Sequence, residues 1–494
     1  MTKSVCIIGA GIGGLTAGAY LAQSGYKVTI YEKATTVGGS AGAYTRHKRT
    51  FPTGATVGFG LEESGVLSDI LKDLQITIPL QKLDHPMDVI LPSGKVSIYQ
   101  DSSLWEKELR LVQPVSQENI LKFWNMLEQI SSDVEEIVKQ RISLPIQSWS
   151  DVQRLAKLGV ISPIILFRLA RFALWSVEDL MKKCKVKDIE PLRQFIDAQL
   201  MDAVQTDSSK AALLPSSLAL SIYRRGSFSI DGGFSTLCKA LAKRIEELGG
   251  TIKLATSVKE IQYIKETEKW DVRGKRLQEL FDIVINNSGV SFGEGTSYMK
   301  EEAFSWGAFR IDAILERQVI SKLNSSMLPF AYQIVLPENR TKNSSKIHGP
   351  LYVTFHESRD SLGNIVKDEV MMTASIHTDA RLWKSYSKEQ YVLEKDKIYS
   401  EMLEVINRVI PINPFLKYAE AGTPLTYLKY MGKTEVGGFP LDVMTAVIRP
   451  KSFRTKNNHF YIVGEQVFPG PGTLSSALSG YYAARAIMKH SKIV

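Results

Sequence analysis

The sequence predicts an α/β fold in which one parallel sheet is assembled from stretches that lie far apart along the 494 residues. Three observations support this prediction. A strand, a glycine turn, a helix and a second strand follow one another at residues 4–31. A glycine pair, an amphipathic helix and several short strands occur at residues 232–287. A strand, a loop rich in glycine and proline, and a helix follow from His459.

The first unit has the order of a βαβ unit, because a helix from Leu15 to Ser24 separates the strands at residues 4–8 and 27–31. The turn between the first strand and the helix carries the fingerprint of a Rossmann-like dinucleotide site, with glycines at Gly9, Gly11, Gly13 and Gly14. These glycines permit a tight turn, close approach of the backbone to a pyrophosphate, and close packing of helix and strand. The helix N-terminus offers amide hydrogens to the phosphate charge.

The residues after the second strand indicate which nucleotide is bound. Glu32 ends that strand, where a carboxylate accepts hydrogen bonds from ribose hydroxyls and repels a 2′-phosphate, so FAD or NAD is favoured over NADP. Gly38, Gly39 and Ser40 form a second glycine cluster for which a plain NAD domain has no use. This cluster resembles the extension of two-dinucleotide-domain flavoproteins, in which it meets the second phosphate. FAD is therefore the expected cofactor.

The last segment supplies a second helix start. Gly464 and Glu465 follow a short apolar strand, and a loop through Gly472 and Thr473 leads into a helix from Leu474. Placed at a flavin, the N-terminus of this helix would stabilise negative charge on the pyrimidine ring. The alternative is a C-terminal helix that only packs on the core.

The FAD-binding domain is thus expected to be discontinuous, with an α+β substrate domain inserted into it. The expected parts of the FAD-binding domain are residues 1–89, 225–294 and 456–494. The expected parts of the substrate domain are residues 90–224, mostly helical, and residues 295–455, in which strands alternate with a helix at residues 388–409.

Composition and charge narrow the partners. With 61 Lys+Arg against 52 Asp+Glu, the net charge of +9 is compatible with nucleic acid, an anionic membrane surface or an acidic ligand. No nucleic-acid-binding module is present, and aromatic side chains are not interleaved with the basic clusters. We therefore expect no nucleic acid, and an apolar small-molecule substrate.

Residues 152–176 are basic and apolar, with four cations and no acid: Arg154, Lys157, Arg168 and Arg171. The longest apolar run, residues 160–167, is too short to span a bilayer, for which about 20 residues are needed. We expect a pair of interfacial helices in peripheral contact with an anionic membrane. Burial in the substrate domain, with the basic side chains reaching outward, is the alternative.

Cysteine and histidine usage favours a reducing compartment without a metal site. Cys6, Cys184 and Cys238 are odd in number and widely spaced, which is typical of intracellular proteins. There is no Cys-x-x-Cys motif and no histidine pair at i, i+4, so no bound metal is expected. The expected location is cytoplasmic, at the inner face of a membrane.

Taken in order, these motifs resemble the phytoene desaturase and carotenoid cis-trans isomerase family of FAD flavoproteins, over nearly the whole chain. The isomerase-like and hydroxycarotenoid-desaturase branch is the most similar. Ser40 stands where the main desaturases usually have arginine, and Phe195-Ile196-Asp197-Ala198 has a counterpart in the isomerases. The segments at residues 422–426 and 464–472 also resemble family segments.

The resemblance implies a noncovalently bound FAD, with the ribose at Glu32, the adenine at the backbone of Val258 and the ribityl chain at Glu465. Glu465 replaces the usual aspartate, and residues 473–476 depart from the usual Val-Pro-Gly-Val. The remaining expected cofactor contacts are Gly9, Gly11, Gly13, Gly14, Lys33, Gly39, Ser40, Gly464, Gly472, Thr473 and Leu474.

The function implied is that of an FAD-dependent oxidoreductase on a long apolar polyene or isoprenoid, by desaturation or by flavin-assisted cis-trans isomerisation. No catalytic acid, base or nucleophile is identified, and flavin chemistry demands few. One alternative is a flavin amine oxidase, which needs facing aromatic side chains; a non-catalytic flavin-binding subunit is another. The aromatic candidates are Trp306, Tyr332, Trp383, Tyr427 and Tyr430.

Overall fold

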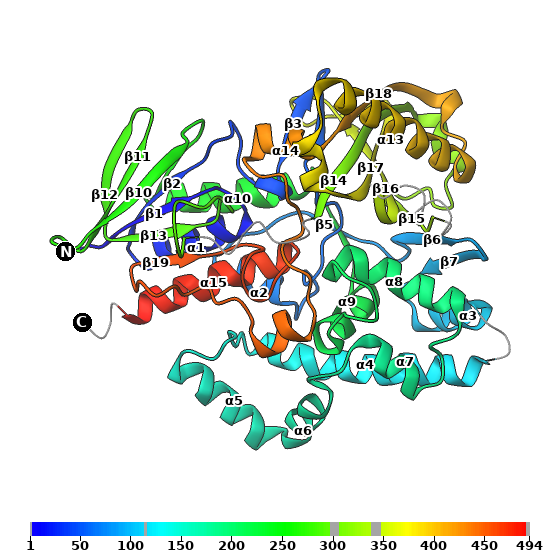
Figure 1. Cartoon of the computed structure of the whole chain (residues 1–494), viewed down its shortest axis with the longest axis horizontal. Coiled ribbons are helices and arrows are strands. Elements are labelled where there is room, and N and C mark those ends of the chain that lie inside the picture. Colours follow the sequence, from blue (N-terminus) through cyan, green and yellow to red (C-terminus); the bar gives the residue numbers. More distant parts are fainter. Residues whose placement is uncertain (1, 113–115, 297–305, 337–346, 491–494) are drawn as a thin grey trace.

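The computed structural model describes residues 2–112, 116–296, 306–336 and 347–490, and the predicted α/β fold is confirmed (Figure 1). One of its two large sheets has five parallel strands in the order β19-β13-β1-β2-β9. The bounds are β1 Ser4–Ile8, β2 Lys27–Tyr31, β9 Thr251–Lys253, β13 Ile283–Asn286 and β19 Phe460–Ile462. Three stretches that lie far apart along the chain therefore meet in this sheet.

Both faces of the parallel sheet are covered, so its strands are buried almost throughout. On one face α1 packs between two other helices, and Ile30 of β2 points at α1. On the other face lies a three-stranded antiparallel sheet, and Tyr31 of β2 contacts its Phe281, with ring centroids 6.2 Å apart. The covering elements are α1 Ile12–Gln23, α10 Phe234–Glu247, α15 Thr473–His490, β10 Val258–Ile264, β11 Lys269–Gly274 and β12 Leu277–Phe281.

The second large sheet has seven strands in the order β18-β14-β17-β16-β15-β6-β7, antiparallel except for the β15–β6 pair. Its strands are β6 Met87–Leu91, β7 Gly94–Ile98, β14 Trp306–Glu316, β15 Phe330–Ile334, β16 Ile347–Arg359, β17 Ile365–Asp379 and β18 Leu416–Gly422. β6 begins before residue 90, so this sheet extends across the expected domain boundary. Packed with it are α12 Ala380–Ser385, α13 Lys388–Val409, which is the helix expected there, and α14 Pro424–Met431.

Helices fill most of the chain between β7 and residue 225 (Figure 1). They are α3 Ser102–Val112, α4 Gln117–Lys139, α5 Trp149–Ile161, α6 Pro163–Phe172, α7 Val177–Lys183, α8 Glu190–Val204 and α9 Leu213–Arg225. Ser162 separates α5 from α6, because Pro163 cannot continue a helix but suits the first turn of the next. Among the described residues, no helix combines the length and apolarity needed to cross a membrane.

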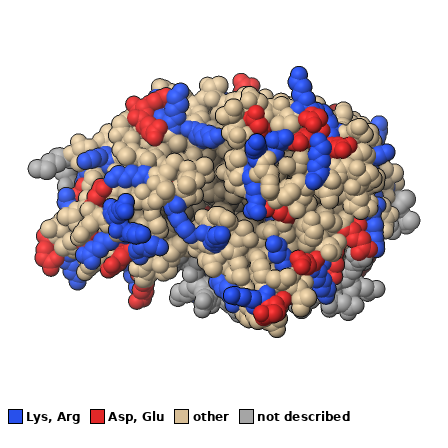
Figure 2. Space-filling view, turned by 90° about the horizontal axis from the view of Figure 1, so that it is seen from above, with Lys and Arg blue, Asp and Glu red and all other residues tan. Residues whose placement is uncertain are grey.

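Smaller elements connect the two halves. They are α2 Val66–Asp73, the ribbon of β3 Ala43–Arg46 with β4 Arg49–Pro52, and the ribbon of β5 Leu80–Lys82 with β8 Phe228–Ile230. Acidic and basic side chains are interspersed on the face seen in Figure 2. That face therefore offers no broad surface of one sign, such as a nucleic acid would require.

Candidate cofactor site

The backbone conformation and the close neighbours of the turn after β1 require glycines there. Gly9 has a φ of 98°, which side chains disfavour, and its amide donates to the carbonyl of Tyr31 at 2.8 Å. A Cβ on Gly14 would lie 2.4 Å from the Gly9 carbonyl oxygen, and one on Gly11 would lie 2.8 Å from the Asn287 amide nitrogen. Any side chain at these positions would push apart β1, α1 and the end of β13.

The N-terminus of α1 is left open for an anion. Gly11 is its N-cap, no side chain caps it, and its first turn holds no acid. The first amides of a helix have no partner within the helix, so a phosphate at this end would satisfy them. Asn287 braces the turn by donating from Nδ2 to the Gly9 carbonyl at 3.1 Å. A Cβ added to Gly13 would lie 3.0 Å from the carbonyl oxygen of Ser476 in α15.

Glu32 is held beside this turn by the backbone. Its two carboxylate oxygens accept hydrogen bonds from the Ala10 amide at 2.7 Å and the Ala34 amide at 2.8 Å. The carboxylate is half-buried, at the end of β2 where the ribose is expected. Lys33 is exposed and its Nζ donates to the carbonyl of Lys429 in α14 at 3.1 Å. The expected contact of Lys33 with the cofactor stays a prediction.

The second glycine cluster lies directly on the first. The Gly38 amide donates to the Ala10 carbonyl at 2.8 Å, and Gly38 forms a bridge with Gly11. Gly39 adopts a φ of 55°, and its added Cβ would lie 3.6 Å from the Gly11 Cα. Gly39 and Ser40 are both exposed. The two clusters thus form one backbone-lined surface, as a pyrophosphate requires.

Val258 lies close to Glu32. The Thr256 amide donates to the Glu32 carbonyl at 2.8 Å, and two residues later Val258 opens β10. Its pairing with Gly274 is followed by a break in register before Glu260. The residue expected at the adenine therefore lies next to the residue expected at the ribose.

The segment at the start of α15 lies on the other side of the glycine turn. Gly464 has a φ of 98° and its amide donates to Ser479 Oγ at 2.8 Å. Glu465 forms an ion pair with Lys433. Gly472 is exposed, with a φ of 95°, and Thr473 begins α15. The predicted contacts thus converge from three separate stretches, and the donor set fits FAD.

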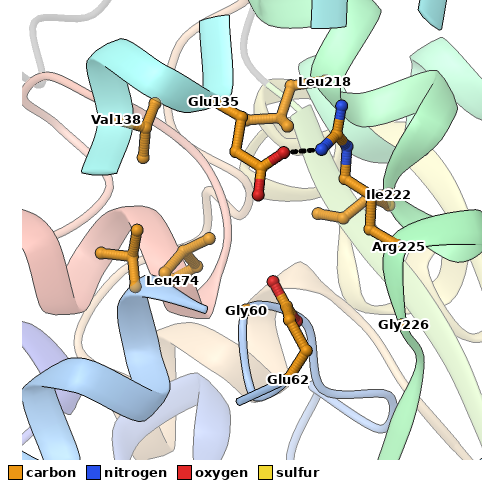
Figure 3. Close-up of a pocket in the computed structure, with 10 residues that line it drawn as sticks. Gly60, Glu62, Glu135, Val138, Leu218, Ile222, Arg225, Gly226 and Leu474 are labelled. Carbon is orange, nitrogen blue, oxygen red and sulfur yellow. Dashed lines mark ion pairs between the residues drawn. The ribbon is translucent and has the colours of Figure 1, made fainter. Parts of the chain in front are cut away.

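A small cavity adjoins the start of α15, where Leu474 forms part of the wall (Figure 3). It has room for about 30 Å³, the space of one or two waters. Glu62 and Glu135 point toward each other across it, and Arg225 pairs with Glu135. Burial lowers the pKa of Arg225, although the charges of Glu62 and Glu128 oppose this effect. Sequence reasoning missed these charges, which come from α4, α9 and a loop and share no motif.

Four of the aromatic side chains considered for an amine site lie in different surroundings. Tyr332 and Trp383 are each 2% exposed within the core of the second sheet. Trp306 packs edge-on against His348 and His377, and Tyr430 is exposed. Among the described residues, no group of three or more His, Cys, Asp or Glu side chains could hold a metal.

The motif shared with the isomerases serves the fold. Phe195 packs in the helical core against Trp105 and Trp124. The Asp197 carboxylate accepts from the Ser208 amide at 2.7 Å and so fixes the turn after α8.

Comparisons with known proteins match this architecture. Residues 7–74 match the family model described as an NAD(P)-binding Rossmann-like domain. The chain is 24% identical to prolycopene isomerase of Daucus carota, over 97% of this chain and 79% of that protein. It is 22% identical to 4,4′-diapophytoene desaturase of Staphylococcus haemolyticus, over 98% of each.

A solved structure shows the same fold. Cyclohexylamine oxidase of Brevibacterium oxydans superimposes with a TM-score of 0.60, at 14% identity and full coverage of both chains. The family model, the curated relatives and this fold together confirm the prediction of an FAD-dependent enzyme. Over nearly its whole length the chain is similar to carotenoid isomerases and desaturases.

Proposed function

We propose that this enzyme desaturates or isomerises a long apolar polyene or isoprenoid at a bound FAD. The observation that supports this most strongly is similarity over nearly the whole chain to enzymes of these two reaction types. The meeting of the segments expected to bind the cofactor adds to it. FAD supplies the redox chemistry of either reaction. The chain's own residues bind the cofactor, orient the substrate and exclude water.

Two features of the chain perform these tasks. The N-terminus of α1 has no side-chain cap and the first turn of α15 holds no acid, so their amides would stabilise the phosphates and the flavin ring of a bound FAD. The ion pair of Arg310 with Asp312 fixes the substrate sheet to the cofactor domain. Arg310 donates to the carbonyls of Thr53 and Pro52 at 2.6 and 2.5 Å, next to the loop that covers Ser40.

Anaerobic incubation of the purified holoenzyme with cis and trans polyenes tests the proposal. Loss of two hydrogens by mass, with loss of flavin absorbance, identifies a desaturase. Interconversion of isomers at unchanged mass identifies an isomerase. Rapid reduction of the flavin by amines, with none by polyenes, contradicts the proposal and favours an amine oxidase.

We further propose that α5 and α6 dock on an anionic membrane. Large apolar side chains stand exposed on both helices, including Val160 at 83% and Phe167 at 71%. The others are Trp149, Val152, Ile161, Ile164 and, just after α6, Leu174. So many exposed apolar side chains on one helix pair favour insertion among lipids over packing in the core.

Not all of the cations on α5 and α6 are available to bind lipid headgroups. Arg168 donates two hydrogen bonds to Asp133, both at 2.7 Å, so its charge is already neutralised. Lys157 and Arg171 are exposed, and we assign the attraction to anionic headgroups to them. The free, buried thiols of the three cysteines support a reducing, cytoplasmic side for this contact.

Flotation with vesicles containing phosphatidylserine tests membrane docking. The I164E/F167E and K157E/R171E variants should each lose flotation, and K239E/K243E, an equal change of charge on exposed positions of α10, should retain it. Flotation that is unaffected by both pairs on α5 and α6, or equal on neutral vesicles, would contradict the proposal.

A further inference from the structure

The segment that follows α14, residues 432–438, joins the substrate sheet to the expected cofactor site. The Val436 amide donates to the carbonyl of Trp306, the first residue of β14, at 2.9 Å. This hydrogen bond anchors the segment to the substrate sheet. At its other end, Gly438 packs against the backbone of Glu465. The segment therefore contacts both halves of the molecule.

Lys433 in this segment lies at the carboxyl edge of the parallel sheet. Its stem packs on Gly289, just beyond β13, since a Cβ added to Gly289 would lie 3.3 Å from Lys433 Cδ. Its ammonium forms an ion pair with Glu465, just beyond β19, and the two side chains are only 17% and 19% exposed. Ligands of open α/β sheets bind outside the carboxyl ends of the strands. The ion pair thus lies at the edge where the cofactor is expected.

Glu465 is linked through one side chain to the glycine turn expected at the pyrophosphate. A Cβ added to the preceding residue, Gly464, would lie 3.1 Å from Asn287 Oδ1. The Nδ2 of the same Asn287 donates to the Gly9 carbonyl at 3.1 Å. Asn287 therefore holds the loop after β19 beside the turn after β1, and it places Glu465 close to the phosphates of a bound FAD.

The negative charge of Glu465 is unfavourable at this place unless a cation compensates it. A pyrophosphate is itself anionic, so a carboxylate nearby repels it. Within the described residues, the structure shows no ion-pair partner for Glu465 other than Lys433. Glutamate is also one methylene longer than the aspartate that is usual here, and the longer side chain reaches the lysine of the neighbouring segment. The carboxylate and its cation therefore form a matched pair.

We propose that Lys433 is a cofactor-positioning residue that acts through Glu465. It fixes the Glu465 carboxylate where this group can accept a hydrogen bond from the ribityl chain, and it cancels the charge that would otherwise repel the phosphates. Because residues 432–438 are anchored to β14, the substrate sheet takes part in holding FAD. The inference goes beyond the proposed function, since it concerns the cofactor and holds for any substrate.

Titration of the apoprotein with FAD tests the inference. K433M should weaken FAD binding by about tenfold or more, because it leaves a largely buried carboxylate unpaired beside the phosphates. K433R should bind FAD nearly as the wild type does, since arginine also pairs with a carboxylate. E465Q should have a small effect, because a carboxamide still accepts a hydrogen bond. K433M/E465Q should bind FAD like E465Q, because the neutral carboxamide needs no cation.

K384M provides the matched control. Lys384 on α12 pairs at 3.3 Å with Glu435, which belongs to the same segment and lies two residues after Lys433. K384M therefore removes the same charge and another ion pair of the segment, but not the cation beside Glu465. It should leave the affinity for FAD unchanged. An equal loss of affinity in K384M and K433M would overturn the inference, because any anchor of the segment would then suffice.

The reduction potential of the bound flavin, measured at saturating FAD, is a readout that a merely structural ion pair would not move. K433M should lower this potential, because an unpaired carboxylate near the cofactor disfavours added electrons, and K433M/E465Q should restore it. Neither measurement needs a substrate, so both stand even if the proposed function fails. Wild-type affinity and potential in K433M would overturn the inference. A loss in K433M that E465Q does not recover would also overturn it, since Lys433 would then not act through Glu465.

Discussion

Gly480 controls how closely α1 and α15 approach, and replacing it tests how the cofactor site is built. A Cβ at this position would lie 2.1 Å from the Gly13 carbonyl oxygen and 3.1 Å from the Ala17 amide nitrogen. Ordinary contacts begin near 3.4 Å, so G480A must move the helices apart by roughly 1 Å. The atoms in the way belong to the backbone of a buried helix, which cannot rotate aside.

The expected cost follows from this overlap. Overpacking a well-filled core costs about 1–3 kcal/mol, and here both helices that begin at the expected cofactor site are displaced. G480A should therefore lower the melting temperature and weaken FAD binding by about tenfold or more, since 1.4 kcal/mol corresponds to a factor of ten. Thermal unfolding and titration of the apoprotein with FAD measure the two effects.

G159A provides the matched control, because it is also a glycine-to-alanine change within a helix. The nearest atom to its added Cβ is a terminal methyl of Leu166 at 3.0 Å, which can turn away. G159A should bind FAD as the wild type does. If G480A also binds FAD and melts like the wild type, the tight contact of α1 with α15 does not position the cofactor, and the reasoning fails.

Three further predictions concern charged groups. E32A should weaken FAD binding by about tenfold or more in the same titration, because hydrogen bonds to a charged acceptor contribute about 1.5–3 kcal/mol. E32Q should be less affected. Equal FAD affinity of E32A and the wild type would exclude a contact of Glu32 with the ribose. R310M should destabilise the protein by about 3–5 kcal/mol by leaving Asp312 buried and unpaired, and R310M/D312L should recover part of this in thermal melts. Burial would raise the pKa of Asp151, but Ser143 and Arg485 hold it below its usual range. The carboxylate therefore stabilises the folded protein above about pH 4, and this stabilisation is lost as the pH falls further. D151N should melt at a lower temperature than the wild type at pH 7 and lose less stability on acidification.

The cofactor half was predictable because its signals are local. The glycine turn, the acid at the end of β2 and the second glycine cluster lie within about forty residues, and their spacing alone predicts a βαβ unit. The strand, loop and helix near Gly472 were predictable in the same way, because they are also adjacent in sequence. That these segments share one sheet was expected from their strands, glycine turns and helices, and the strand order shows it.

The substrate half was less predictable because its contacts join distant residues that form no motif. Arg168 was expected to face lipid, but Asp133, 35 residues earlier on α4, neutralises it. Burial of Tyr332 and Trp383 likewise depends on sheet pairing, which composition does not reveal.

The central claim is that one FAD, held by the glycine clusters and the start of α15, faces a polyene substrate. The absorbance of the flavin in purified protein, recorded anaerobically while a polyene is added, tests it most directly. We predict flavin absorbance that corresponds to about one FAD per chain. This absorbance should respond to the polyene, either by a loss or by a shift as isomers interconvert. Protein without flavin, or flavin that responds to amines and not to polyenes, would contradict the account.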